Sequence, residues 1–381
     1  MENNGSNTSS FTSTAAVSDQ EVGDKVVVTS AYAIIFPVAL FGNLLAIYIV
    51  ISKRYMRSVT NLLLVNMFVG NLLVACVVMP YSVSFLFVES RWFGGGFGSF
   101  TCKFVHFAYA LPIAASIFAL LLSSVDRYFA VIYPFSQLHF IRNAKASTAM
   151  IWILSFCFIS PYLWSFKVLE GDGLHFCVPD WTPLDPIESP KIYFSILFVA
   201  LYFVPLAIMS TLYLMIGLKL WKRKIPGNAI RNAKRAAEIA KKKVVKMLII
   251  VVVVFALSWI PTHSMHVLIF FDSERYAALP LILKGLAFWI CHANSAISPC
   301  LFWFSVRSTV VDLWRSSGED SPVAIKSTLA SAPDLFALIH SAEISLQSTT
   351  DQAVRKTMKL HCSKTFKYVA LFVELKRYKT L

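Results

Sequence analysis

The segment that decides the fold is FVHFAYALPIAASIFALLLSSVDRYFAVI, residues 104–132. It contains no Asp, Glu, Lys or Arg before the pair Asp126 and Arg127. About 20 apolar residues in a helix cross the roughly 30 Å of hydrocarbon in a bilayer. Ionisable residues near a membrane interior are costly and usually functional, although an interfacial anchor pair would explain one of the two charges. The segment therefore predicts a transmembrane helix that ends in a functional polar pair.

Six further segments have the same apolar character. The predicted cores of the seven spans are residues 26–51, 61–87, 104–132, 146–166, 192–221, 244–271 and 279–304. None shows the alternation that a spanning strand requires. Only 15% of the residues are charged, whereas a soluble domain usually carries about 25%. The chain is predicted to be an all-α membrane protein, a seven-transmembrane helix bundle.

The net charge of +14 sets the predicted orientation. Basic residues lie in short runs between spans, at residues 53–57 and 222–243, and not on an amphipathic face, which argues against nucleic acid as a partner. The opposite loops are acidic. The positive-inside rule places the N-terminus outside and the C-terminus in the cytoplasm. Asn4 and Asn7 begin short glycosylation patterns on the outer segment.

Four regions follow from this reading. Residues 1–25 are predicted to be a disordered, glycosylated outer segment, and residues 26–305 the membrane domain. Residues 306–316 carry an apolar stripe and Trp314, which favours a short amphipathic helix in the membrane interface over a fraying helix end. Residues 317–381 are predicted to be a disordered cytoplasmic tail, rich in Ser and Thr.

The sequence has seven cysteines, most of them inside apolar runs, where Cys behaves as a small hydrophobe. Cys102 and Cys177 lie at or just outside span ends and are the disulfide candidates, the alternative being two free thiols. Cys102 precedes Arg127 by roughly 37 Å of helix at about 1.5 Å per residue. It is therefore outside if Arg127 is cytoplasmic, and the outside of a cell is oxidising.

The run SSVDRYFAVIYPF, residues 123–135, closely resembles the third-helix signature of rhodopsin-like (class A) G-protein-coupled receptors. Gly42-Asn43 and Trp152 resemble the first and fourth helices of that family. The resemblance implies that Asp126 holds Arg127 in the inactive state and that Arg127 turns toward a G protein in the active state. It also implies a Cys102–Cys177 disulfide that pins the second outer loop.

Further residues resemble the family's activation switch. The implied set is Asp126, Arg127, Tyr128, Tyr213, Phe255, Trp259, Pro261, Pro299 and Phe302. Phe255 and Trp259 are four residues apart and share a helix face. Pro261 removes a backbone hydrogen bond, so the sixth helix is expected to bend there. Each residue alone fits ordinary packing, but their order along the chain argues against that reading.

The family's sodium site is altered. Its positions here are Asn71, Ser116, Asn294, Ser295 and Ser298. Asn71 replaces the usual Asp, Ser298 the usual Asn, and Phe302 a nearby Tyr. A hard cation needs the missing carboxylate, so this degenerate pocket is predicted not to bind sodium. Lys241 stands near the place where some members carry an acid that pairs with the Arg. No metal site and no cofactor are expected.

The ligand-binding residues are predicted from the same resemblance. They are Tyr109, Ile113, Asp180, Trp181, Trp259, His263, His266, Phe288 and His292. Tyr109 replaces the Asp of amine receptors, and His292 replaces the retinal Lys of visual pigments. The outer loop HFCVPDWTP, residues 175–183, looks like that of several neuropeptide receptors. Acidic outer loops would steer a basic peptide, but they are equally expected as solvated loops. His263 and His266 lack an evident third metal ligand.

These observations predict a plasma-membrane receptor, not an enzyme, that binds an extracellular neuropeptide and activates a heterotrimeric G protein. Arrestin and a receptor kinase are further predicted partners of the tail. A transporter or membrane enzyme would need paired intramembrane carboxylates, a metal cluster or repeats, which the sequence lacks. A decoy or scaffold receptor without coupling stays open because Asn71, Ser298 and Phe302 depart from the family, although intact Asp126-Arg127-Tyr128 argues against it.

Overall fold

The computed structural model describes residues 7–52, 56–133, 143–222 and 231–316. Its internal contacts divide the chain into two units. The first consists of Met1–Lys219 and Ile249–Pro299, and the second of Leu220–Leu248 and Cys300–Leu381.

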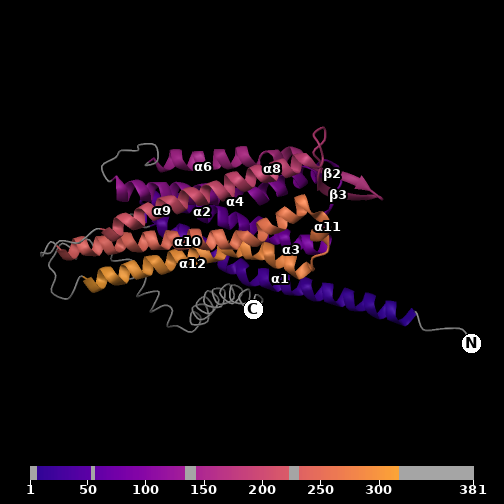
Figure 1. Cartoon of the computed structure of the whole chain (residues 1–381), viewed down its shortest axis with the longest axis horizontal. Helices are drawn as coiled ribbons and strands as arrows, with labels where there is room; N and C mark the ends of the chain where they lie inside the picture. Colours follow the sequence, from indigo (N-terminus) through magenta and orange to yellow (C-terminus); the bar gives the residue numbers. More distant parts are fainter. Residues whose placement is uncertain (1–6, 53–55, 134–142, 223–230, 317–381) are drawn as a thin grey trace, which may run out of the picture. The chain divides into compact units, whose positions relative to one another are not determined.

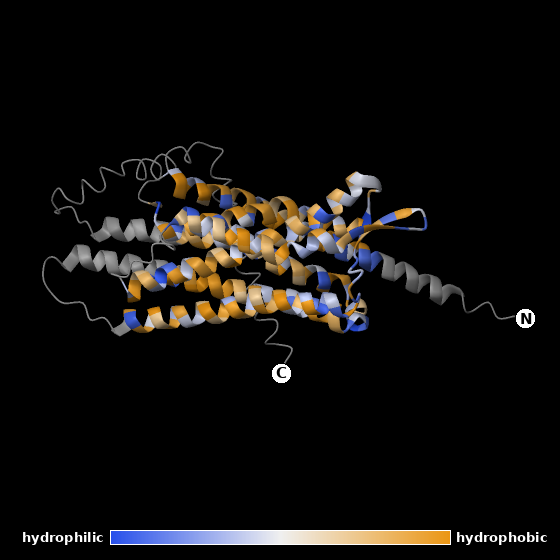
Figure 2. Ribbon diagram, turned by 90° about the horizontal axis from the view of Figure 1, so that it is seen from above, coloured by the Kyte–Doolittle hydropathy of each residue, from blue (hydrophilic) through white to orange (hydrophobic). Residues whose placement is uncertain are grey.

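Seven helical stretches among the described residues are long and apolar enough to cross a membrane. They are Asp19–Ser52, Val59–Val88, Gly95–Ile132, Ala144–Ser165, Glu188–Leu220, Val245–Phe271 and Leu281–Phe304. Each contains or closely matches one predicted span, so the prediction of seven membrane-spanning helices is confirmed. Apolar residues cover most of the length of these helices, and hydrophilic residues gather toward their ends (Figure 2). Large side chains such as Phe203 and Leu214 are more than half exposed, as expected where lipid is the solvent.

The elements follow one another along the chain as shown in Figure 1. The helices are α1 (Asn7–Ser52), α2 (Val59–Leu73), η2 (Val74–Val78), α3 (Met79–Val88), α4 (Gly95–Ile132), α6 (Ala144–Ile159), α7 (Pro161–Ser165), α8 (Glu188–Phe198), η3 (Val199–Phe203), α9 (Val204–Lys222), α10 (Arg231–Phe271), α11 (Ser273–Ala277) and α12 (Leu281–Ser316). The π-helical turns η2 and η3 each end two residues before a proline, Pro80 and Pro205 respectively. A proline lacks a backbone donor and clashes with the carbonyl of residue i−4, which disturbs regular α-helical bonding there.

Helix α1 begins at Asn7, so it includes most of the outer segment for which the sequence predicted disorder. Lys25 pairs with Glu21 one helical turn earlier at 2.8 Å. The Asp24 carboxylate accepts a hydrogen bond of 3.1 Å from the backbone N–H of Ile282, in the first turn of α12. The N-terminal part of α1 is thus joined by a hydrogen bond to a helix more than 250 residues away in the chain, which local sequence patterns do not reveal.

Residues from two connections between helices form a small antiparallel sheet. One connection joins α3 to α4, and the other joins α7 to α8. The sheet consists of β1 (Arg91–Trp92), β2 (Phe166–Gly171) and β3 (Leu174–Pro179), in the order β1-β3-β2. The β2–β3 turn is Asp172-Gly173, and both residues have positive φ, 52° and 74°. Asp-Gly is a favoured pair for a two-residue hairpin turn of this kind. In the register Val168 faces Cys177, which places Cys177 in the central strand.

One core cluster of the first unit joins α1, η2, α3 and α12. Its buried members are Val28, Tyr32, Ile35, Ala39, Val74, Ala75, Val78, Met79, Ala293 and Ala296. Small residues allow close approach: a Cβ added at Gly70 in α2 would lie 2.8 Å from the carbonyl oxygen of Pro112 in α4. Close approach of backbones through small residues is typical of helix packing in membranes.

Residues 306–316 are helical, but they form the last part of α12 and not a separate element. The interfacial helix therefore remains a prediction. The predicted tail, residues 317–381, lies outside the described residues, as does Asn4. Asn7 is the first residue of α1, and its glycosylation also remains a prediction.

Candidate functional site

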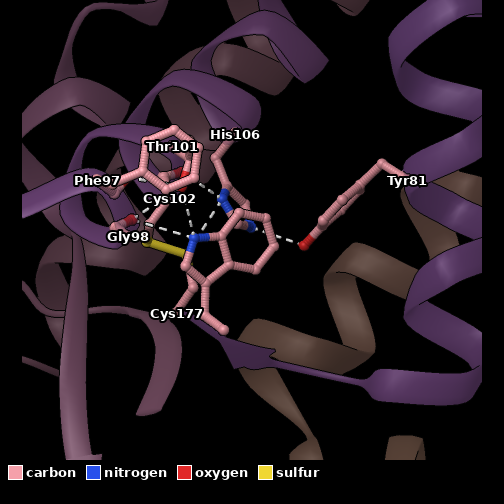
Figure 3. The surroundings of a disulfide bond; sticks show 8 residues. Tyr81, Phe97, Gly98, Thr101, Cys102, His106 and Cys177 are labelled. Atoms are coloured by element: carbon pink, nitrogen blue, oxygen red, sulfur yellow. Dashed lines mark hydrogen bonds between the residues drawn. A yellow bond between two sulfur atoms is a disulfide. The ribbon is translucent and has the colours of Figure 1, made fainter. Parts of the chain in front are cut away.

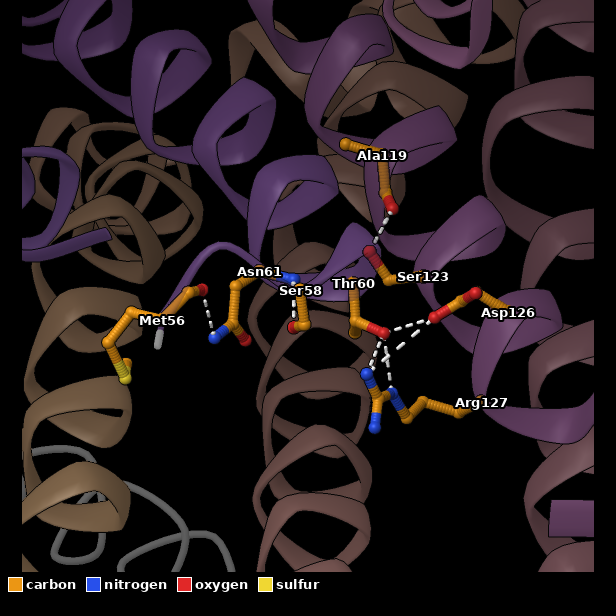
Figure 4. A network of polar contacts seen from close by, with 8 residues as sticks. All are labelled: Met56, Ser58, Thr60, Asn61, Ala119, Ser123, Asp126 and Arg127. Carbon is orange, nitrogen blue, oxygen red and sulfur yellow. Dashed lines mark hydrogen bonds and ion pairs between the residues drawn. The ribbon is translucent and has the colours of Figure 1, made fainter. Parts of the chain in front are cut away.

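The predicted polar pair at the end of α4 lies in a hydrogen-bonded cluster with a residue of α2 (Figure 4). The Arg127 Nη2 and Asp126 Oδ2 atoms are 3.6 Å apart, and both side chains are largely buried. The hydroxyl of Thr60 donates to Asp126. It also accepts hydrogen bonds from Arg127 Nε, at 2.6 Å, and from Arg127 Nη2. The sequence reasoning did not find Thr60, because an isolated Thr in an apolar span has no distinguishing pattern.

Tyr213 and Tyr128 are two further residues of the predicted activation switch. Tyr213 of α9 is buried, and its hydroxyl accepts a 2.8 Å hydrogen bond from Ser124 of α4. Tyr128 contacts the rings of Phe129 and Tyr133 instead of joining the Arg127 cluster. On α9, Lys219 donates to the carbonyl of Ile132 at the end of α4, with an Nζ–O distance of 3.2 Å. Helices α4 and α9 are thus joined by two hydrogen bonds, one between Ser124 and Tyr213 and one between Lys219 and Ile132.

The remaining switch residues belong to α10 and α12. The rings of Phe255 and Trp259 have centroids 5.7 Å apart, as their spacing predicted. Pro261 lies within α10, and Pro299 within α12. The ring of Pro299 packs against Gly42 of α1, where an added Cβ would lie 3.0 Å from it. Phe302 belongs to the second unit, where it is buried.

The altered sodium-site residues form a network of neutral groups. Asn71 Nδ2 donates to Asn43 Oδ1 at 3.1 Å. Asn43 Nδ2 in turn donates to the Ala39 and Ser295 carbonyls, at 2.6 and 2.9 Å. The amide of Asn71 therefore acts as a donor toward α1, which is the opposite of what a cation needs from this position.

The hydroxyl groups of this region bond within their own helices. Ser298 donates to the carbonyl of Asn294, and Ser116 to that of Pro112. The buried Asn294 Oδ1 atom has no hydrogen-bond partner among the described residues. Asn43 is the central residue of the network. The sequence indicated Asn43 only because Gly42-Asn43 resembles the first helix of the family. That resemblance does not specify the hydrogen-bond partners of Asn43.

A buried histidine of the first unit lies between two tyrosines. His292 of α12 is 2% exposed. Its Nδ1 lies 2.8 Å from the hydroxyl of Tyr32 in α1, and its Nε2 lies 3.2 Å from the hydroxyl of Tyr109 in α4. A neutral imidazole has one donor and one acceptor nitrogen, so one tyrosine donates to the ring and the other accepts from it. Tyr32 was missed, since it resembles any other aromatic residue of an apolar span.

His263 and His266 lie in an aromatic cluster formed by α8, η3, α10 and α12. The ring of His263 contacts those of Phe198, Tyr202 and Trp259, and the ring of His266 contacts those of Phe194, Phe270 and Phe288. The Nδ1 atoms of both histidines and Nε1 of Trp259 are buried, with no hydrogen-bond partner in the described part of the chain. Buried polar atoms normally have partners, so these three are candidates for contact with a ligand.

The other predicted ligand residues are distributed between core and loop. Ile113 packs against the core cluster that contains Val28. Trp181 is mostly buried, between the rings of Trp164 and Tyr193. Asp180 forms a 2.9 Å ion pair with Lys167 of β2.

The Asp180 carboxylate also accepts hydrogen bonds from the backbone N–H and the side chain of Thr182. Hydrogen bonding by Lys167, with a further contribution from Thr182, lowers the pKa of Asp180 to about 2. Its charge is therefore already paired within the loop, which reduces its availability to a cationic ligand.

The expected disulfide between Cys102 and Cys177 is present and joins α4 to the central strand β3 (Figure 3). The adjacent His106 ring accepts or donates through both nitrogens: Nε2 lies 2.8 Å from the hydroxyl of Tyr81, and Nδ1 lies 2.8 Å from the Cys102 carbonyl. The ring stacks on Phe166 of β2 with a centroid distance of 3.8 Å. The two cysteines and His106 are close enough to hold a metal, but the sulfur atoms are bonded to each other.

A helical membrane protein with this disulfide and this polar cluster is a seven-helix receptor by its fold and site. A sequence profile described as "7 transmembrane receptor (rhodopsin family)" matches residues 42–302, and the chain belongs to this family. The family consists of receptors and not enzymes, so the transporter and enzyme alternatives are not favoured.

Similar proteins include the mouse (Mus musculus) neuromedin-K receptor, 33% identical over 71% of this chain and 59% of the relative. The mouse substance-K receptor is 30% identical over 72% of this chain and 70% of the relative. The zebrafish (Danio rerio) galanin receptor 2a is 30% identical over 73% of this chain and 74% of the relative. The matched region thus spans less than two thirds of the neuromedin-K receptor.

Proposed function

We propose that the protein is a receptor of the plasma membrane that binds an extracellular peptide and promotes nucleotide exchange on a heterotrimeric G protein. The N-terminus is proposed to lie outside and the C-terminus in the cytoplasm, on the basis of the positive-inside rule. The tail is proposed to bind a receptor kinase and arrestin, because it is rich in Ser and Thr. Related receptors named for neuromedin K, substance K and galanin support a peptide as the ligand.

The observation that carries this proposal is the presence of two polar sites on one uninterrupted helix. Helix α4 holds Tyr109 beside the buried His292, and it holds Arg127 beside Thr60. Tyr109 and Arg127 are roughly 27 Å apart along the helix at about 1.5 Å per residue. A ligand that changes the packing around Tyr109 can therefore bias the arrangement at Arg127 through a shared rigid element.

The proposed ligand contacts centre on His263, His266 and Trp259. Their three unpartnered buried atoms would be satisfied by polar groups of a ligand, while the surrounding rings would pack against apolar side chains. Since Asp180 is paired with Lys167, we propose that steering of a basic peptide depends on other acidic loop residues. Glu170 and Asp172 at the β2–β3 turn have no ion-pair partner among the described residues and are the best candidates.

The test is agonist-driven nucleotide exchange on purified receptor in lipid nanodiscs. Neuromedin K, substance K, galanin and a panel of basic amidated peptides are applied in parallel. We expect at least one peptide to bind and to accelerate exchange. Arg127→Ala should abolish that acceleration while peptide affinity stays near that of the unmodified receptor, because Arg127 lies far from the proposed ligand contacts. Acceleration that persists in Arg127→Ala would refute its assigned role.

The second candidate function is that of a non-coupling receptor, favoured by Asn71, Ser298 and Phe302 at positions where the family usually differs. The same assay separates the two. High-affinity peptide binding without exchange on any G-protein subtype would support the decoy function and overturn the coupling function.

A further inference from the structure

The hydroxyl of Thr60 lies between a carboxylate and a guanidinium group (Figure 4). Thr60 lies in the first turn of α2 and is completely buried. Its Oγ1 atom contacts Asp126 Oδ2, Arg127 Nε and Arg127 Nη2. The sequence patterns predicted no function for Thr60.

The geometry makes Thr60 the main hydrogen-bond partner of Arg127 in this cluster. Charge-assisted hydrogen bonds between guanidinium and carboxylate groups are usually about 2.7–2.9 Å long. The direct Arg127–Asp126 separation of 3.6 Å is longer than that. By contrast, Arg127 Nε lies 2.6 Å from the Thr60 hydroxyl. The ion pair is therefore connected mainly through Thr60.

The hydrogen-bonding capacity of the hydroxyl is fully used. A threonine hydroxyl has one hydrogen to donate and two lone pairs that accept. Arg127 has only donors and ionised Asp126 only acceptors, so the direction of each bond is fixed. Thr60 donates its hydrogen to Asp126 and accepts two hydrogen bonds from Arg127. A serine can make the same three bonds, whereas an isosteric valine can make none.

The start of α2 fixes where this hydroxyl lies. Ser58 is the N-cap of α2, and its Oγ accepts from the N–H of Asn61 at 3.3 Å. The Asn61 side chain donates to the carbonyl of Met56 at 2.8 Å. Because these bonds determine where the first turn begins, they hold Thr60 against α4. A different helix thus supplies the group that restrains Arg127.

We infer that Thr60 is the positioning residue that keeps Arg127 beside Asp126 in the resting receptor. The inference rests on the proposed coupling function. The sequence has Lys241 where some receptors carry an acidic partner for this arginine, and an ammonium group has no acceptor. The two acceptor sites of Thr60 provide the restraint from α2 instead. Release of Arg127 toward a G protein requires these bonds to break.

Loss of the hydroxyl should therefore shift the resting population toward the released state. A ligand or substitution changes such an equilibrium by the difference in free energy that it makes between the two states. Hydrogen bonds to charged groups contribute more than neutral ones, and about 1.4 kcal/mol corresponds to a tenfold change. We expect basal exchange, without peptide, to rise about tenfold in Thr60→Val.

The experiment compares four receptors in nanodiscs: unmodified, Thr60→Val, Thr60→Ser and Thr211→Val. Thr211 of α9 is exposed, and among the described residues its hydroxyl bonds only to the Ala207 carbonyl of its own helix, so Thr211→Val is a matched control for the same chemical change. Basal exchange, peptide-stimulated exchange and the apparent thermal midpoint are measured. We expect raised basal exchange in Thr60→Val alone, with Thr60→Ser and Thr211→Val close to the unmodified receptor.

A merely structural role for Thr60 would lower the thermal midpoint without raising basal exchange, and that result would overturn the inference. If Thr60→Val does not fold, Thr60→Ala also removes the hydroxyl and must show the same rise. Basal exchange in a folded hydroxyl-free variant that stays at the level of Thr211→Val also overturns it. Absence of peptide-stimulated exchange in the unmodified receptor counts against the proposed function, whereas a rise in Thr60→Val still supports the restraint.

Discussion

Gly70 tests whether α2 and α4 pack as closely as the structure indicates. An added Cβ at this buried position would overlap Ser116 Oγ and would lie 2.8 Å from the Pro112 carbonyl oxygen. Contacts this short force a shift, and the Pro112 oxygen is backbone, held in place by the helix. Ser116 Oγ itself bonds to this oxygen at 2.9 Å, so it cannot move away without losing that bond. Gly70→Ala should therefore destabilise the receptor.

The expected change in the free energy of unfolding is the difference of two opposing contributions. Overpacking a well-packed core typically costs about 1–3 kcal/mol, and a backbone contact places this site near the upper end. Replacing a helical Gly by Ala contributes about 1 kcal/mol in the opposite direction. The net destabilisation is thus about 2 kcal/mol, the difference of these two values. The double variant Gly70→Ala/Ser116→Ala should be less destabilised than Gly70→Ala. Ser116→Ala removes the contact with Oγ but leaves the contact with the Pro112 carbonyl oxygen.

The assay is the apparent midpoint of thermal unfolding of purified receptor in detergent, at one fixed scan rate, since such transitions depend on rate. Gly217→Ala in α9 is the matched control, because a Cβ there would meet no atom within 4 Å. It should raise the midpoint slightly, whereas Gly70→Ala should lower it by several degrees. Equal and upward shifts in both variants would refute the reasoning about close approach of α2 and α4.

Four further predictions concern other contacts. Agonist affinity should respond to sodium no more than to an equal concentration of a bulky organic cation, because Asn71 is neutral and donates to Asn43; a sodium-selective fall at matched ionic strength would contradict this. Asn71→Asp alone should restore only part of a sodium effect, since Ser298 remains altered. Cys177→Ser should abolish ligand binding or surface expression, because a cross-link over 75 residues is lost and such links typically contribute about 2–4 kcal/mol; normal binding by the variant would argue against it. Asp24→Ala should destabilise the receptor by about 1 kcal/mol, as removal of a helix cap does, and Asp24→Asn should not, since an amide oxygen still accepts from Ile282; equal thermal midpoints for both variants would exclude this role.

Some features needed the sequence together with a known family pattern. The Cys102–Cys177 disulfide was expected from this combination, and the structure contains it. The Asp-Gly pair at residues 172–173 is a hairpin signal in the sequence itself, and the structure has the β2–β3 turn there. The predicted switch residues and most predicted ligand residues lie in the expected helices, and Asp180 and Trp181 lie in the loop after β3. Their individual roles remain proposals.

The amino-acid sequence by itself determined the seven spans and their approximate ends. Hydropathy is a local property, and about 20 apolar residues suffice to define a span whatever its neighbours are. It also placed Asp126 and Arg127 at the end of the third span, because charges interrupt an apolar run visibly. Tertiary structure alone decided that Thr60 joins that pair, that His292 lies between Tyr32 and Tyr109, and that Asp24 caps α12. These contacts depend on how each helix is rotated about its axis and where it crosses its neighbours, and side-chain packing between distant segments sets both.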